Sequence, residues 1–149
     1  MANDTTRRVF LGAVGVAAAA GSEAAGTEKV TGIGGFFFRA KDPKALAKWY
    51  ADHLGIGLVP TSYGAQPWRQ EAGPCAFQPF PEKTTYFGDD TKRWMLNFRV
   101  RGMDKMAAQL RAAGITVDID QQLYPNGRFA HLHDPEGNPI ELWEPKDER

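Results

Sequence analysis

Residues 127–145 read GRFAHLHDPEGNPIELWEP, and this stretch decides the fold. Two short runs of alternating apolar and polar residues flank the cluster DPEGN at 134–138, whose proline and glycine favour a reversal of the backbone. The pattern predicts a β-hairpin. Because successive side chains of a strand point to opposite faces, one face of this hairpin is apolar and is expected to pack on a core. That face consists of Ala130, Leu132, Ile140 and Leu142.

The opposite face of the predicted hairpin carries chemically active side chains. Its members are Phe129, His131, His133, Glu141 and Trp143. If the strands pair so that His131 lies opposite Glu141, the two Cβ atoms would be about 5 Å apart. We interpret this face as the wall of a binding site. His133 lies nearest the turn, and we interpret it as a hydrogen-bonded surface residue.

The composition of the chain limits the classes of function. A length of 149 residues suffices for one domain or for two small fused halves with a core. The 18 basic residues balance the 18 acidic residues, so no general field attracts nucleic acid or anionic lipid. Cys75 is the single cysteine, which excludes an intramolecular disulfide, and we expect it to be a small buried residue.

The first 27 residues predict an export signal and leader that are not part of the fold. The run RRVFL at 7–11, followed by an alanine- and glycine-rich run to Ala20, resembles the twin-arginine signal of bacteria. The apolar run is shorter than the roughly 20 residues that a membrane-spanning helix needs. We therefore expect an exported, periplasmic protein with no stable membrane span after removal of the signal. The sequence does not fix the cleavage site.

Residues 28–147 repeat one pattern twice. In the first copy, residues 28–84, a strand-like segment with FFF at 36–38 leads into a helix that begins at Asp42 and Pro43 and ends at Gly55. Three strand candidates follow, at 56–62, 68–71 and 75–80.

The second copy, residues 92–147, has a strand at 94–100, a helix that ends at Gly114, a strand at 115–119 and then the hairpin. A period of about 60 residues that occurs twice indicates a duplicated βαβββ unit, with residues 81–92 as the connector. We predict an α+β fold in which two tandem units form a half-barrel with a concave cleft.

The duplicated unit, the opening run FFFRAKDPKALAKWYADHLGI and the closing run HLHDPEGNPIELWEP together resemble the vicinal oxygen chelate (VOC) family. That family includes glyoxalase I, the extradiol dioxygenases, and the bleomycin and fosfomycin resistance proteins. The resemblance spans residues 32–145 and implies a glyoxalase-like fold and a homodimer. It implies no particular reaction, because one fold hosts many functions.

Metal-dependent members of the family hold their ion with one ligand on the first strand and one on the last strand of each unit. The resemblance places these positions on Gly35, on Gln78 or Phe77, on Met95 and on Glu141. Glycine offers no donor side chain, and methionine suits soft copper rather than a hard or borderline divalent ion. We therefore expect no cofactor, with a divalent metal in a displaced site as the alternative. The displaced site would use Gln78, His131 and Glu141.

The alternation along the strands predicts which side chains line the cleft. Apolar walls with a few converging polar groups are typical of a small-molecule pocket. For Arg39 or Arg99 alone, a salt bridge at a strand end is the better interpretation. Their matching places in the two copies favour instead two guanidinium groups that bind a carboxylate or phosphonate. We therefore expect a small aromatic or carboxylate-bearing ligand. The expected ligand-binding residues are Phe37, Arg39, Gln78, Asn97, Arg99 and Trp143.

The sequence leaves open whether the protein is an enzyme. Glu141 and His131 are the catalytic candidates, because an imidazole beside a carboxylate can move a proton next to a carbonyl group. The alternatives to a metal-free binding protein are a glyoxalase-type lyase, isomerase or dioxygenase with a non-standard metal site, and an interaction module with an inert cleft.

Overall fold

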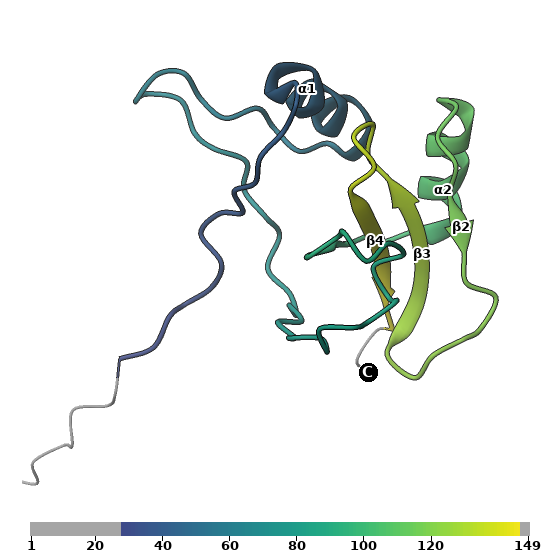
Figure 1. Ribbon diagram of the computed structural model, residues 1–149. Coiled ribbons are helices and arrows are strands. Elements are labelled where there is room, and N and C mark those ends of the chain that lie inside the picture. The colour runs from purple at the N-terminus through teal and green to yellow at the C-terminus, as the bar shows by residue number, and fades with distance from the viewer. Residues whose placement is uncertain (1–27, 147–149) are drawn as a thin grey trace, which may run out of the picture. The chain divides into compact units, whose positions relative to one another are not determined.

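The structure is a computed structural model, and it describes residues 28–146. The chain divides into two units, residues 1–36 and 37–149, and the helices and strands described here belong to the second. The export signal predicted at residues 1–27 lies outside the described residues. The elements, in chain order, are α1 (Pro43–Leu54), β1 (Leu96–Arg99), α2 (Met103–Ala112), β2 (Asp118–Ile119), β3 (Gly127–His133) and β4 (Pro139–Pro145) (Figure 1).

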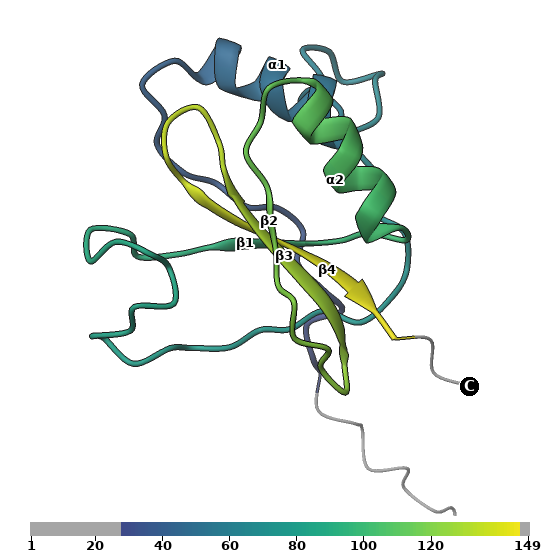
Figure 2. The same ribbon diagram turned by 90° about the vertical axis from the view of Figure 1, so that its right-hand side faces the viewer.

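The strands of the second unit form one open, mixed sheet in the order β1-β4-β3-β2. Strands β3 and β4 are the two arms of the predicted hairpin, and Figure 2 shows them running side by side from their turn. β1 pairs in parallel with β4, and β2 pairs antiparallel with β3. The register places His131 opposite Glu141, which is the pairing that the displaced site and the catalytic pair assume. The α+β fold class and the hairpin are therefore confirmed.

The core lies on the apolar face of the hairpin. Ala130, Ile140 and Leu142 are fully buried, and Leu132 is 2% exposed. Both helices supply the partners of this face, and each fully buried large apolar side chain contributes about 1.5 to 3 kcal/mol before the entropy of ordering is counted. Packing both helices on one side leaves the chemically active face of the sheet outside the core. The buried helical residues are Leu46 and Tyr50 of α1, and Met103, Ala107 and Leu110 of α2.

The turn of the hairpin is also the docking point of α1. Asp134 is 4% exposed and accepts hydrogen bonds from the backbone N–H groups of Glu136 and Asn138, each at 2.9 Å, and from the Asn138 amide at 2.8 Å. The hydroxyl of Tyr50 in α1 donates to the same carboxylate at 2.9 Å. Burial, and then the nearby Asp134 charge, raise the pKa of Tyr50, which keeps this hydroxyl a donor. Glu136 accepts the backbone N–H groups of residues 41 and 42, each at 2.9 Å.

The helix ends follow their sequence signals. The Asp42 side chain caps α1 by accepting from the second and third backbone N–H groups after it, and Pro43 occupies the first turn. Gly55 ends α1 in the left-handed conformation, with φ of 70°. α2 has no side-chain cap of its own, and Glu144 of β4 accepts the N–H of Met103 at 3.2 Å instead. Within residues 28–146, neither helix is long and apolar enough to cross a membrane.

The first copy differs from the prediction. Its helix forms, but none of the segments predicted as strands, at 29–40, 56–62, 68–71 and 75–80, is a strand in the part of the chain described. A strand is stable only when its N–H and C=O groups find a neighbouring strand, and the prolines at 60, 67, 74 and 79 remove donors. The sheet of the described residues is accordingly open, and it does not close with a second sheet into a half-barrel. Phe37, Val59 and Phe77 are 85% exposed or more.

Candidate functional site

Two rows of side chains cross the face of the sheet that lies opposite the core. Arg99 of β1, Trp143 of β4 and Phe129 of β3 are register partners and form the first row. Asn97, Glu141 and His131 form the second row in the same way. Paired residues on neighbouring strands project to the same face. The strand alternation thus brings five of the eight ligand-binding or catalytic residues expected from the sequence onto one surface. They are Asn97, Arg99, His131, Glu141 and Trp143.

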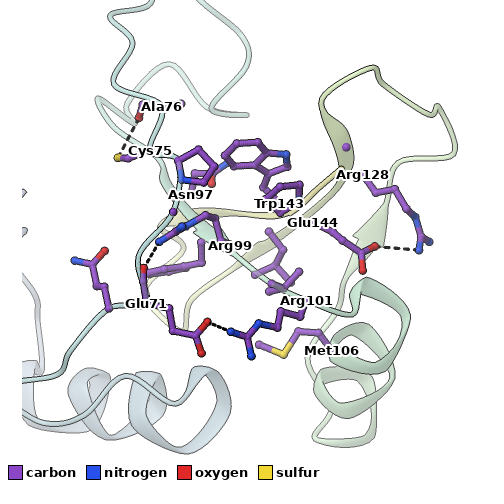
Figure 3. A pocket seen from close by; sticks show the side chains of 18 of the residues that line it. Glu71, Cys75, Ala76, Asn97, Arg99, Arg101, Met106, Arg128, Trp143 and Glu144 are labelled. Carbon is purple, nitrogen blue, oxygen red and sulfur yellow. Dashed lines mark hydrogen bonds and ion pairs between the residues drawn. The ribbon is translucent and has the colours of Figure 1, made fainter. Parts of the chain in front are cut away.

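Arg99 and Trp143 of the first row line an open hollow of about 1210 Å³. Its wall also includes the extended segment 68–76, with Trp68 and Cys75, and residues from the ends of β1 and β4, from both helices and from 123–128. Figure 3 shows Arg99, Trp143 and Asn97 around this hollow. Among the described residues, the charged side chains on the wall are five basic and two acidic ones, a balance that suits an anion. The basic ones are Arg69, Arg99, Arg101, Arg128 and Lys146.

The guanidinium group of Arg99 is held against segment 68–76. It donates to the backbone carbonyl of Glu71 at 2.6 Å, and Arg101 forms an ion pair with the carboxylate of the same residue (Figure 3). A Cβ atom built on Gly73 would lie 1.5 Å from the Arg99 Nη1, so a larger residue at this position would displace the guanidinium from its present place. The segment fixes the arginine while leaving other donors of its five-donor fork for a ligand.

The Trp143 indole is an ordered, flat aromatic surface next to Arg99. Its indole Nε1–H donates to the backbone carbonyl of Asn126 at 2.9 Å. Its ring is parallel to that of Phe129, at 3° and a centroid distance of 6.3 Å, and the ring of Tyr124 meets Phe129 edge-on at 5.5 Å. Because the indole is held by a hydrogen bond and by stacking, a ligand ring that packs on it meets a surface that is already ordered.

Glu141, in the second row, is 4% exposed and is covered by a residue of the connector. The hydroxyl of Tyr86 donates to both oxygens of its carboxylate, at 3.1 and 3.3 Å. The ring of Tyr86 stacks on Phe80 at 5.2 Å and meets His131 edge-on at 5.9 Å. Burial, followed by the charge of Glu141, raises the pKa of Tyr86 to about 12, so the phenol is a neutral donor at neutral pH.

His131 lies between two tyrosine–carboxylate pairs. Tyr86 and Glu141 lie on one side, and on the other the Tyr124 hydroxyl donates to Asp120 at 2.7 Å. Hydrogen bonds from the Gln122 backbone and from Tyr124, with a smaller contribution from His131, hold the pKa of Asp120 below its usual range. The imidazole therefore has a phenol in ring contact and a carboxylate as its register partner, and these are groups of the kind that proton transfer uses.

The structure places the eight predicted site residues in three surroundings. Asn97, Arg99 and Trp143 line the large hollow, whereas Glu141 and His131 lie beside it under Tyr86. The three others are outside the hollow: Phe37 is 94% exposed, and Arg39 and Gln78 are exposed. Cys75 is also exposed rather than buried as predicted, because segment 68–76 lies on the surface and not in a second sheet.

The donor set does not fit the divalent metal that the fold family commonly uses. Catalytic sites usually present three protein ligands to such an ion. Within residues 28–146, no group of three or more histidine, cysteine or acidic side chains is arranged to hold a metal. Glu141 has Tyr86 on both carboxylate oxygens, and Gln78, the third member of the displaced site, is exposed. No step of the chemistry is therefore assigned to a metal.

Two features of the site were missed by the sequence interpretation. Tyr86 lies in the predicted connector, Glu71 is the last residue of a predicted strand, and Gly73 lies between two predicted strands. Strand alternation identifies only residues that belong to the sheet. The one available signal was the aromatic run Tyr86-Phe87 in an otherwise polar connector.

The comparisons with known proteins agree with this arrangement. The profile of the glyoxalase-like domain family matches residues 35–143. The chain belongs to the glyoxalase-like domain family. This membership confirms the resemblance to the VOC family. The match covers α1, the connector, both rows of the site and the sheet except for the last two residues of β4. No curated protein matches the chain.

Several solved structures are similar to this glyoxalase-like protein. TnmS3, an antibiotic-binding protein from Streptomyces sp. CB03234, is 26% identical, with 70% of this chain and 88% of that chain covered and a TM-score of 0.44. The oxidase ChaP-H2 is 23% identical over 72% and 87% of the two chains, with a TM-score of 0.44. A virulence protein from Salmonella typhimurium is 20% identical over 70% and 89%, with a TM-score of 0.43.

Proposed function

We propose that this glyoxalase-like protein binds a small aromatic molecule that bears a carboxylate or a similar planar acid. The observation that carries the proposal is the register pair of Arg99 and Trp143 on the wall of the hollow. The guanidinium supplies a fork of donors for the acid, and the indole supplies a flat surface for the ring.

The charge and the depth of the hollow support an anionic ligand of modest size. The excess of basic side chains around Arg99 raises the local concentration of anions. The hollow is open and is larger than a typical ligand pocket of about 300 to 1,000 Å³, so one or two fused rings can lie on Trp143. An arginine that contacts a ligand acid at a half-exposed site contributes about 1.5 to 3 kcal/mol to binding.

Calorimetric titration of the protein with 2-naphthoic acid and with its neutral relative 2-naphthamide tests the proposal. We expect the acid to bind at least about tenfold more tightly than the amide, and Arg99→Gln to remove this difference. Arg99→Lys, which keeps the charge but loses the fork, should retain part of it. Arg93→Gln is the control, because Arg93 is exposed and lies outside the hollow. Equal binding of the acid to the wild-type and Arg99→Gln proteins would contradict the proposal.

A catalytic function at the second row is the alternative that the register favours. His131 lies opposite Glu141, and the imidazole is close to donors and acceptors of two tyrosine–carboxylate pairs. Such a pair can take a proton from a carbon next to a carbonyl group and return one from solvent. Exchange of the methylene protons of phenylpyruvate in D₂O, followed by ¹H NMR, measures this step. Exchange that is faster than in buffer alone, and that falls to the buffer rate in His131→Ala, would support catalysis. Exchange at the buffer rate in the wild-type protein would exclude catalysis of this step for phenylpyruvate.

We also propose that the chain is exported through its twin-arginine run. The support is the run RRVFL at 7–11 and the small-residue stretch that follows it. In a bacterial host, the Arg7→Lys, Arg8→Lys protein should remain in the cytoplasm while the wild-type protein reaches the periplasm with a shortened N-terminus. Export of the double variant would refute this assignment.

We also propose that the protein is a homodimer. The support is the family membership together with the exposed apolar side chains of the first copy, among them Val59 and Phe77. Light scattering coupled to size-exclusion chromatography should give twice the mass of one chain. A single-chain mass at micromolar concentration would refute the dimer without affecting the binding site.

A further inference from the structure

The hydrogen bond between Tyr86 and the Glu141 carboxylate plays no part in the proposed binding at the first row. We propose that Glu141 is a subsite for a hydroxyl or amino group of the ligand, and that Tyr86 occupies this subsite until the ligand displaces it. The inference rests on the proposed binding of an aromatic acid. It adds to that proposal the group that holds the end of the ligand opposite the acid.

The Glu141 carboxylate has acceptor positions to spare. An ionised carboxylate offers about four lone-pair positions. Within residues 28–146, the one donor that reaches these oxygens is the Tyr86 hydroxyl, which shares a single proton between them at 3.1 and 3.3 Å. Because the side chain is 4% exposed, bulk water has little access to the remaining positions. A ligand that carries a hydrogen-bond donor complements them, and one that carries an ether oxygen does not.

Tyr86 is placed so that it can leave Glu141 without disturbing the sheet. It belongs to the connector between the two copies, outside every helix and strand, and is 45% exposed. Its ring contacts are with Phe80 and with the edge of His131. None of the strand pairs involves the connector, so the phenol can move away while the carboxylate stays fixed on β4.

The two rows are separated by a distance that a two-ring ligand spans. Glu141 and Trp143 are two residues apart on β4, which is about 7 Å along a strand. Asn97, which is exposed, lines the hollow and is the register partner of Glu141, so the second row begins at the hollow and continues to the carboxylate. Because Arg99 pairs with Trp143, Glu141 is the diagonal neighbour of Arg99 across β1 and β4. A naphthoic acid that keeps its carboxylate at Arg99 and lies along this diagonal, over the edge of Trp143, brings the substituent at its far end to Glu141.

The inference is tested with three probes that differ only at the far end. Titration calorimetry of the full chain compares 2-naphthoic acid, 6-hydroxy-2-naphthoic acid and 6-methoxy-2-naphthoic acid. In the wild-type protein the ligand hydroxyl only exchanges for the Tyr86 hydroxyl, so its preference over the ether is small. In Tyr86→Phe the competing donor is absent, and the ratio of the methoxy to the hydroxy dissociation constant should rise about tenfold. Tyr63→Phe is the matched control, since Tyr63 is fully exposed and lies outside the hollow.

The possible outcomes separate this inference from the function on which it rests. Glu141→Leu, with its fold checked by circular dichroism, should bind the hydroxy and methoxy acids equally. A ratio that is the same in the wild-type and Tyr86→Phe proteins overturns the inference and leaves aromatic-acid binding intact. An equal loss of affinity for all three probes in Tyr86→Phe also overturns it, because Tyr86 would then contact the ligand itself. Failure of all three probes to bind the wild-type protein overturns both proposals.

Discussion

Replacing Asp134 with alanine removes the group that ties the hairpin turn to α1. The carboxylate accepts four hydrogen bonds, at 2.8 to 2.9 Å, from Tyr50, from the backbone of Glu136 and from both nitrogens of Asn138. Because Asp134 is 4% exposed and Tyr50 is 6% exposed, solvent cannot replace the lost partner of the Tyr50 hydroxyl. A buried polar group left without its partner costs about 1 to 3 kcal/mol, and loss of the partner of a buried charged network costs about 3 to 5 kcal/mol.

We therefore expect Asp134→Ala to lower the free energy of unfolding by about 3 to 5 kcal/mol. Tyr50→Phe removes only one of the four hydrogen bonds and should cost about 1 to 2 kcal/mol. In the double variant the two losses should not add, because both act on the Tyr50–Asp134 contact.

Urea unfolding followed by circular dichroism measures these changes. With a urea dependence of about 1 to 3 kcal/mol per molar for a small domain, Asp134→Ala should lower the midpoint by about 2 M. Asp89→Ala is the control, because Asp89 caps an exposed turn at Thr91 and its loss should cost less than about 1 kcal/mol. A loss below about 1 kcal/mol for Asp134→Ala would show that the turn does not hold α1.

Three further predictions concern the site and its supports. The pKa of Tyr86 is raised from 10.0 to about 12, mainly by burial, so the neutral phenol stabilises the folded state fully below pH 10 and this contribution is lost as the pH rises through 12. The difference between the absorbance titrations of the wild-type and Tyr86→Phe proteins should therefore have its midpoint near pH 12. A midpoint near pH 10 would contradict the contact of Tyr86 with Glu141. Gly127→Ala should lower the free energy of unfolding by about 2 to 4 kcal/mol in thermal or urea melts, because φ is +135° and the new Cβ would lie 2.2 Å from a backbone carbonyl oxygen of β4. Gly64→Ala is the control: Gly64 has open space around it, so the free energy of unfolding should change by less than about 1 kcal/mol. The exposed thiol of Cys75 should react with a colorimetric disulfide reagent in the native protein, and 2-naphthoic acid should slow the reaction because Cys75 lines the hollow; an unreactive thiol would contradict the exposure of segment 68–76.

Local signals predicted the order of the elements in the second copy and the ends of α1, although the predicted strand at 115–119 is a strand only at Asp118–Ile119. The alternation in residues 127–145 predicted that His131 and Glu141 share one face and that the buried set lies on the other. Asp42 and Gly55 delimit α1 as their residue types suggest. In each case the physical cause lies within a few residues of the signal, since alternation and capping are local properties of the backbone.

The first copy and the cover of Glu141 could not be predicted, because both depend on contacts distant in sequence. A run such as 75–80 has strand-like composition, but a strand also needs a neighbour for its backbone, and composition does not supply one. Arg39 and Arg99 are equivalent in the sequence repeat, yet only Arg99 is held by segment 68–76 and lines the hollow. Tyr86 reaches Glu141 across 55 residues of sequence, a contact that no periodicity reveals.

The central claim is that a small aromatic acid binds on Trp143 beside Arg99. The most direct measurement is the set of four tryptophan indole N–H signals in a ¹H–¹⁵N correlation spectrum during titration with 2-naphthoic acid, with the Trp143 signal assigned by its loss in Trp143→Phe. The Trp143 signal should shift most and should saturate with the dissociation constant found by calorimetry, because its N–H is fixed on Asn126 next to the bound ring. A titration in which the Trp143 signal stays in place while that of Trp49, in α1, moves would contradict the claim.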